Sequence, residues 1–314
     1  MSAAAPFAQR LWLYQAERFP VFRHGLLIAA FGGSAPCLSA LLRGPGELPS
    51  LHAVLASIAC LFLFFFQLRV ADEHKDADDD RKYRPERPVP RGLVTLKELR
   101  YLGFGAAAVQ AILVATLYLP LLAFLALVWV WMVLMTAEFF VPVWLRARPV
   151  LYMVSHMIVM PLIDLFATAT DWLPAGVEPR GAFGVALGAF LLLSFCNGAA
   201  IEIARKSWAP EDERDGVETY SRLWGAHKAG LVAATIMFAG LACAALVHAL
   251  SGAPIVFLVL LMLGAGVGVG AAYVYAAKAT RAAAKRLENF SGLWVLASYM
   301  CLGVLPMGLR LWTG

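Results

Sequence analysis

The residues with the clearest chemical potential lie in one short segment of the 314-residue chain, directly after the apolar run LFLFFF at 61–66. The acidic side chains of this segment are Asp72, Glu73, Asp76, Asp79 and Asp80. If the preceding helix continues through the segment, they share one face, because each residue turns the helix by 100°. Carboxylates about 6 Å apart repel by roughly 3 kcal/mol per pair at an effective dielectric of 20. The pattern therefore predicts a bound cation.

Magnesium is the cation that these ligands favour. Carboxylate oxygens are hard ligands, and neither a cysteine nor a pair of histidines lies nearby. Mg²⁺ is usually completed by water and substrate phosphates, which the basic half of the segment could bind. Its basic residues are Arg81, Lys82, Arg84, Arg87 and Arg91. A second interpretation stays open for them, because basic residues beside a membrane helix also fix its orientation. Acidic residues contribute little to orientation, so that interpretation does not explain the acids.

The composition indicates an integral membrane protein. Apolar side chains make up 61% of the chain and charged ones 15%, so the lipid bilayer is the expected partner and no nucleic acid is expected. Nine apolar runs are long enough to cross about 30 Å of hydrocarbon. They lie at 21–42, 51–70, 97–117, 119–140, 150–171, 182–204, 224–249, 253–277 and 289–312. We therefore predict an all-α membrane protein, with an amphipathic lead-in helix at 1–20 and one nine-helix domain at 21–314.

The distribution of charge predicts how these helices are oriented. With a cytoplasmic N-terminus, every Lys and Arg except Arg43, Arg180 and Arg310 falls on the cytoplasmic side. The acidic loops at 71–96 and 202–223 then share that side. We therefore expect an active site that opens to the cytoplasm.

The second acidic loop lies four predicted helices after the first, as in a repeated four-helix unit. Its candidate site residues are Glu202, Lys206, Glu211, Asp212 and Asp215. They also fit a purely structural interpretation, because Pro210 followed by acids is an ordinary helix start and Glu202 with Lys206 is an i, i+4 pair. The position opposite the first cluster favours a shared site.

Few other polar residues lie in or beside the apolar runs. Asp164 lies in mid-helix, where an ionisable group is costly and is a functional candidate. Hydrogen bonds between packed helices explain His156 and Asn197 equally well. Arg146 and Arg148, after the fourth predicted helix, are either orientation signals or a further phosphate clamp.

These motifs resemble those of the UbiA superfamily of intramembrane prenyltransferases, and the resemblance covers essentially the whole chain. The first family motif, NDxxDxxxD, is matched by Asp72, Glu73, Asp76 and Asp80, with Asp in place of Asn and Glu in place of the first Asp. The family segment R-x-x-R-P-x-P-x-G is intact as Arg84, Arg87, Pro88, Pro90 and Gly92. The resemblance implies nine transmembrane helices around a central cavity, with prenyl diphosphate bound through Mg²⁺ at two aspartate-rich cytoplasmic motifs.

The second family motif departs from the pattern. Its closing G-x-x-T is present as Gly216 and Thr219, which places Asp212 on the last family aspartate but Arg205 and Trp208 on the earlier acids. A three-residue insertion would place Glu202 first, and Glu211 or Asp215 could contribute. The resemblance thus implies the metal ligands Asp72, Glu73, Asp76, Asp80, Glu202 and Asp212. It implies the diphosphate-binding residues Lys82, Arg84, Arg87, Arg91, Arg146 and Lys206.

The implied activity is Mg²⁺-dependent transfer of a prenyl group from prenyl diphosphate to an aromatic or other lipophilic acceptor. An apolar chamber would shield the carbocation, and its candidate wall residues are Phe64, Phe65, Phe66, Phe139, Phe140, Trp144 and Tyr152. Two alternatives stay open: cyclisation of the prenyl diphosphate without an acceptor, and a non-catalytic transporter or scaffold. A CDP-alcohol phosphatidyltransferase is disfavoured, because residues 59–68 lack the glycine and the charges of its motif.

Overall fold

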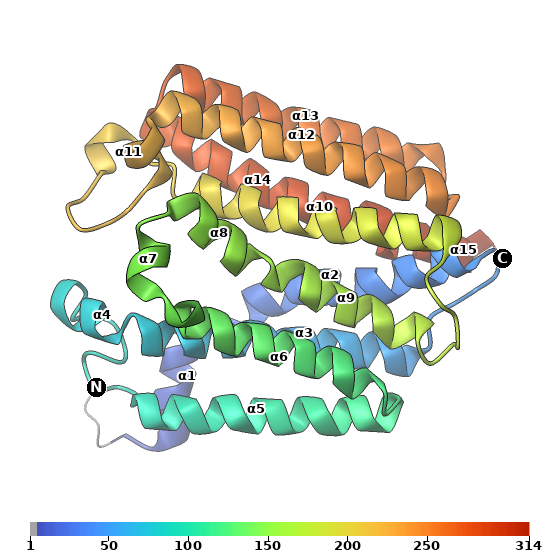
Figure 1. Cartoon of the computed structure of the whole chain (residues 1–314), viewed down its shortest axis with the longest axis horizontal. Helices are drawn as coiled ribbons and strands as arrows, with labels where there is room; N and C mark the ends of the chain where they lie inside the picture. The colour runs from blue at the N-terminus through green and yellow to red at the C-terminus, as the bar shows by residue number, and fades with distance from the viewer. Residues whose placement is uncertain (1–4, 314) are drawn as a thin grey trace.

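The computed structural model describes residues 5–313, with the side chain of Arg23 left aside. Within that range the chain is helical and has no strand, as predicted. Most of its long helices run side by side along one axis (Figure 1). Six of the predicted membrane helices are single uninterrupted elements: α2 (Val21–Arg43), α3 (Leu51–Lys75), α5 (Leu96–Leu117), α10 (Gly181–Arg205), α12 (Ala226–Ser251) and α13 (Ile255–Ala277).

Two predicted helices are each broken in two. The fifth consists of α8 (Pro149–Met157) and α9 (Val159–Trp172), because Pro161 cannot donate a backbone hydrogen bond to Met157. The ninth consists of α14 (Arg281–Leu302) and α15 (Val304–Thr313), so it begins before residue 289. At Gly303, between them, a Cβ atom would lie 2.3 Å from the carbonyl oxygen of Ser34 in α2. Only glycine permits this close approach.

The fourth predicted helix is shorter than the sequence suggested. Its apolar helix, α6 (Leu121–Thr136), has 16 residues. The chain then turns through Glu138, Phe139 and Phe140, all with positive φ, before α7 (Pro142–Arg146) begins. Within the described residues, eight helical segments are therefore long and apolar enough to cross a membrane, and α6 is a shorter ninth.

The charged segments gather at one end of the bundle. The short helices α4 (Ala77–Tyr83), α7 and α11 (Tyr220–Trp224) all lie there, opposite the C-terminus (Figure 1). We call this the charged end. The lead-in helix α1 (Phe7–Arg18) is fastened to it by three ion pairs, each with a nitrogen–oxygen distance of 2.6 Å: Arg10–Glu98, Arg18–Glu73 and Arg91–Glu17.

The opposite end has its own small set of charges. Arg43 pairs with Asp171 at 2.9 Å, and Arg310 donates to the carbonyl oxygens of Gly44 and Glu47, both at 3.0 Å. Arg180 pairs with Glu178 at the same end. Among the Lys and Arg side chains that the structure describes, these three are thus separated from the others, as the charge pattern predicted.

Candidate active site

The first acidic segment does not continue as one helix, so that expectation is wrong. Helix α3 ends at Lys75, Asp76 forms the turn, and α4 follows. Repulsion between carboxylates at i, i+4 spacing works against a continuous helix. Helix α4 ends at Tyr83 because Arg84 precedes Pro85, which disfavours helical geometry at residue 84.

The bend turns Asp80 toward the arginines that follow it. Nη1 of Arg87 donates to both carboxylate oxygens, at 2.8 and 2.7 Å, and Nη1 of Arg84 lies 3.3 Å from Oδ1. The side chain of Asp80 is only 3% exposed. We call these three residues the Asp80 cluster; in this structure the carboxylate holds the arginines of the R-x-x-R segment in place.

Only two acids at the end of α3 are open to a ligand. Glu73 points toward α1, where it is buried and paired with Arg18. Asp72 is 51% exposed and lies 3.3 Å from Arg69. Across the described chain, the carboxylate of Asp76 has no hydrogen-bond or ion-pair partner. Asp72 and Asp76, one helical turn apart, are therefore the available pair.

A second buried acid, Glu138, lies in the turn with positive φ values. Its side chain, 4% exposed, accepts from Lys75 at 2.9 Å and from Arg146 at 2.9 and 3.0 Å. Burial alone would raise the pKa of Glu138, but the hydrogen bonds from Arg146 and Lys75 outweigh it and hold that pKa below its ordinary value of 4.5. Lys75 also donates to the hydroxyl of Tyr152. We call Glu138, Lys75 and Arg146 the Glu138 cluster.

A third acid, Glu202, completes the pattern at the end of α10. It accepts from Arg205 at 2.6 Å and from Lys206 at 2.9 Å, with 14% of its side chain exposed. The charge of Arg205 also interacts with that of Asp72, which links this Glu202 cluster to α3. Each of the three clusters sets one carboxylate against two basic side chains, so each carries a net charge of +1. Three positive clusters thus gather with Asp72 and Asp76 at the charged end.

Three other basic candidates are engaged elsewhere. Lys82 is exposed and lies 4.8 Å from the ring centre of Tyr83. Arg91 pairs with Glu17 of α1. Arg148 donates to the carbonyl oxygen of Trp144 at 2.9 Å and lies over its ring. Their predicted contacts with diphosphate or phosphate stay predictions.

The acids of the second loop turn toward other partners. Asp212 lies 2.7 Å from Nε of Arg281 in α14, and Glu211 lies 3.8 Å from the same atom. Asp215 pairs with Arg222 at 3.1 Å and is fully exposed. The structure therefore brings Glu202 into contact with basic residues near α3, whereas Asp212 pairs with the first turn of α14.

The G-x-x-T segment has a structural explanation. Gly216 has a φ of 79°, which favours glycine. Thr219 is buried, accepts from the backbone N–H of Arg222 at the start of α11, and donates to the carboxylate of Glu213 at 2.7 Å. Both motif residues thus shape the loop.

The open acids could supply two carboxylate ligands to Mg²⁺, but not a complete set of protein ligands. Within residues 5–313, no three His, Cys, Asp or Glu side chains lie together in a way that could hold a metal ion. Mg²⁺ needs only one or two carboxylates when substrate phosphates and water complete its shell, so Asp72 and Asp76 suit it. The roles of Glu73, Asp80, Glu202 and Asp212 as metal ligands stay predictions, since each is held in an ion pair.

The aromatic candidates have different environments. Phe64 is buried against Phe166, with ring centres 5.5 Å apart, whereas Phe65 and Phe66 are partly buried beside the core. Phe139 packs edge-on against Trp131. Phe140 and Trp144 are exposed, and Tyr152 stacks on His156. Of the seven, Tyr152 contacts a cluster residue directly, through Lys75.

The intramembrane polar residues form contacts between helices. Asn197 donates to Ser298 at 3.0 Å and so joins α10 to α14. Asp164 is fully buried and accepts a hydrogen bond from Tyr299 of α14. His156 contacts the carbonyl oxygen of Tyr152 at 2.8 Å and lies 3.4 Å from Nζ of Lys75.

Sequence reasoning missed Lys75 and Glu138. Glu138 had a signal, because it is the one charged residue between 119 and 145. An isolated carboxylate at the end of an apolar run needs a basic partner. Lys75 had no such signal among its many charged neighbours.

Taken together, the fold and the site define an integral multi-pass membrane protein with paired carboxylates and positive clusters at one end. Its sequence matches the model of the UbiA prenyltransferase family over residues 12–305, so the chain belongs to this family. No curated protein sequence gives a significant match.

Two solved structures share the fold. One is a structure of digeranylgeranylglyceryl phosphate synthase, at a TM-score of 0.67 and 16% identity, covering 96% of this chain and 99% of that one. The other is the apo structure of a UbiA homologue from Aeropyrum pernix K1, at a TM-score of 0.64 and 16% identity, covering 87% and 97% of the two chains.

Proposed function

We propose that the protein is a Mg²⁺-dependent intramembrane prenyltransferase, which ionises a prenyl diphosphate and transfers the prenyl group to an aromatic or other lipophilic acceptor. The observation that carries this proposal is the arrangement of the charged end. Asp72 and Asp76 are the open acids at the end of α3, and three clusters of net charge +1 accompany them. Such a site suits a strongly anionic group bound together with a divalent cation.

The positive clusters would stabilise the leaving diphosphate. As the allylic carbon–oxygen bond breaks, negative charge grows on the departing oxygens, and preorganised donors stabilise it without having to reorient. The carboxylates of Asp80, Glu138 and Glu202, of which the first two are buried, hold the donors in place. Mg²⁺ held by Asp72 and Asp76 would supply further positive charge at the phosphate oxygens.

The prenyl chain and its acceptor would occupy the apolar interior next to the charged end. Excluding water there limits hydrolysis of the carbocation, and aromatic faces stabilise its charge. Two wall candidates lie next to the Glu138 cluster. Phe139 follows Glu138 in the chain and packs edge-on against His156, and Tyr152 accepts a hydrogen bond from Lys75. With the N-terminus in the cytoplasm, as the charge pattern predicts, the diphosphate would enter from the cytoplasmic side.

The experiment that tests this function is a product assay. Purified protein is incubated with prenyl diphosphates of several chain lengths, with and without aromatic or lipid acceptors, and the products are identified by mass spectrometry. We expect an acceptor-dependent prenylated product that is lost in EDTA and restored by Mg²⁺, with Zn²⁺ a poor substitute. A cyclic hydrocarbon formed without acceptor would instead identify a terpene cyclase. Intact prenyl diphosphate under all these conditions would favour a transporter or scaffold.

A further inference from the structure

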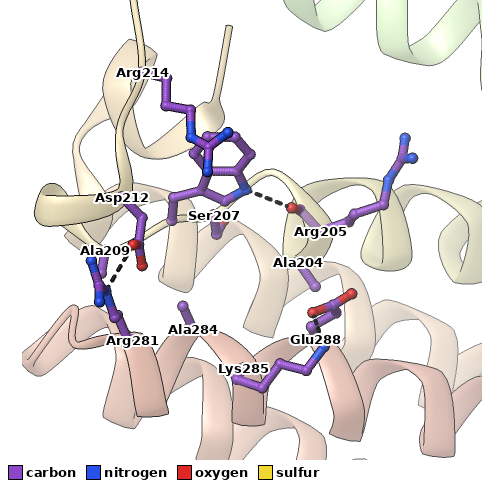
Figure 2. Close-up of a pocket in the computed structure, with 11 residues that line it drawn as sticks. Ala204, Arg205, Ser207, Ala209, Asp212, Arg214, Arg281, Ala284, Lys285 and Glu288 are labelled. Atoms are coloured by element: carbon purple, nitrogen blue, oxygen red, sulfur yellow. Dashed lines mark hydrogen bonds and ion pairs between the residues drawn. The ribbon is translucent and has the colours of Figure 1, made fainter. Parts of the chain in front are cut away.

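A separate cavity of about 260 Å³ lies at the charged end, on the α14 side of the second loop. It is bounded by the last turn of α10, the loop from Ser207 to Arg214 and the first two turns of α14 (Figure 2). A single water needs only about 15 Å³ of such volume, so the cavity has room for a phosphate group.

The guanidinium group of Arg281 lies in this cavity with most of its donors unused. Its ion pair with Asp212 uses Nε, at 2.7 Å, and Glu211 lies 3.8 Å from the same atom. Within the described chain, neither Nη1 nor Nη2 donates a hydrogen bond to another residue. Two such groups form the planar fork that binds two oxygens of one phosphate.

Two more basic side chains come from different segments. Arg214, in the loop, has no ion-pair partner anywhere in residues 5–313. Lys285, one turn after Arg281, pairs with Glu288 at 2.8 Å and keeps two of its three N–H donors. Arg205 turns its guanidinium group away from Arg281 (Figure 2) and pairs with Glu202. The cavity thus sets three basic groups against the two carboxylates of Asp212 and Glu288.

The wall of the cavity is held rigidly by Trp208. Its indole Nε1 donates to the carbonyl oxygen of Arg205 at 3.0 Å, and its backbone N–H donates to the hydroxyl of Ser221 at 2.8 Å. Its own carbonyl oxygen accepts from the hydroxyl of Tyr275 at 2.7 Å. Ala204 and Ala209 are buried beside it, and their small side chains leave the space open. The position where the family has an acid is therefore part of a fixed wall.

We infer that this cavity is a binding site for a phosphate monoester, held by Arg281, Arg214 and Lys285 and distinct from the Asp72–Asp76 site. The cavity lies where α10 and α14 leave the apolar part of the bundle, so a phosphate carried on a lipid can reach it from the membrane boundary. A free phosphate group has the same chemistry and is the other possible source. The inference rests on the cavity itself and does not depend on prenyl transfer.

The test uses the full-length protein in detergent and measures binding of two probes. The first is a short-chain phosphatidic acid, with the matching phosphatidylcholine for comparison, and the second is inorganic phosphate. Arg281→Gln and Arg214→Gln each remove one donor group. Arg286→Gln is the matched control, because Arg286 is exposed on the same helix and does not line the cavity.

We expect wild-type protein and Arg286→Gln to bind phosphatidic acid equally, and both cavity variants to bind it about tenfold more weakly, as expected for loss of a charged hydrogen bond. Phosphatidylcholine should bind weakly to all four proteins. If inorganic phosphate alone shows this dependence, the site takes free phosphate. Equal loss in Arg286→Gln, or no loss in either cavity variant, would overturn the inference. Since Arg214 lies in an exposed loop, Arg214→Gln keeps the test decisive if Arg281→Gln unfolds.

Discussion

Asp80 accepts two hydrogen bonds from a single nitrogen of Arg87, at 2.8 and 2.7 Å, although it belongs to the aspartate-rich motif predicted to bind metal. The same carboxylate faces Arg84. In this structure Asp80 thus orders the basic segment after α4, while Asp72 and Asp76 stay open to a ligand. The aspartates of one motif therefore divide into one buried, ion-paired member and a pair whose carboxylates are open.

This division predicts that Asp80→Asn lowers stability. The substitution removes the carboxylate charge that faces both arginines. We expect the free energy of unfolding to fall by about 2 kcal/mol. This is less than the loss for a fully buried ion pair, because Arg87 is partly exposed. Thermal unfolding in detergent measures the effect. Asp78→Asn is the control, because Asp78 lies in the same helix with its side chain 95% exposed. An Asp80→Asn protein as stable as wild type but inactive would mean that Asp80 acts as a ligand instead.

A second prediction concerns Glu138 and pH. Its folded-state pKa is depressed by Arg146 and Lys75, so its stabilising contribution is present above the ordinary value of 4.5 and is lost as the pH falls through the lower folded-state pKa. Glu138→Gln should therefore be less stable than wild type by about 1–3 kcal/mol near neutral pH, and the difference should shrink below about pH 4.5.

Unfolding temperatures measured from about pH 7 to about pH 3.5 test this. Glu86→Gln, at an exposed position, should follow wild type throughout. A difference between wild type and Glu138→Gln that is independent of pH would show that the charge of Glu138 contributes nothing.

The turn at residues 138–140, where all three φ values are positive, gives a third prediction. Phe140 has a φ of 61° and is 75% exposed, so its side chain gains little packing while its backbone is strained. We expect Phe140→Gly to be about 1 kcal/mol more stable than Phe140→Ala, because glycine adopts positive φ freely. Comparing the two variants separates the backbone effect from loss of the aromatic ring. Equal stability would mean that the turn is not strained at this residue.

Much of the fold could be predicted from the sequence, because apolar runs and basic residues follow strong physical rules. The apolar runs predicted the bounds of most membrane helices to within a few residues. The positions of Arg43, Arg180 and Arg310 distinguished one end of the bundle from the other. The helix breaks at Ile158 and Gly303 were missed. The contact that requires glycine at 303 comes from Ser34 of α2, far away in the sequence.

For the candidate site, most of the charged residues could be predicted from the sequence, but only part of their arrangement. Periodicity placed five acids on one helical face, yet Glu73 pairs with Arg18 and Asp80 with Arg87. Those partners lie on another helix or beyond a helix break, where periodicity does not apply. Lys75 at the end of α3 meets Glu138 in the turn after α6, so their pairing follows from the tertiary structure and not from spacing.

The proposed function is tested most directly by measuring the release of diphosphate from a prenyl diphosphate by purified protein with Mg²⁺. Asp76→Asn removes an open carboxylate without changing its size, and Asp78→Asn makes the same change at an exposed position two residues away. We expect about a 100-fold slower release in Asp76→Asn, with an unchanged unfolding temperature, and wild-type release in Asp78→Asn. Wild-type release by a folded Asp76→Asn protein would contradict the proposed function.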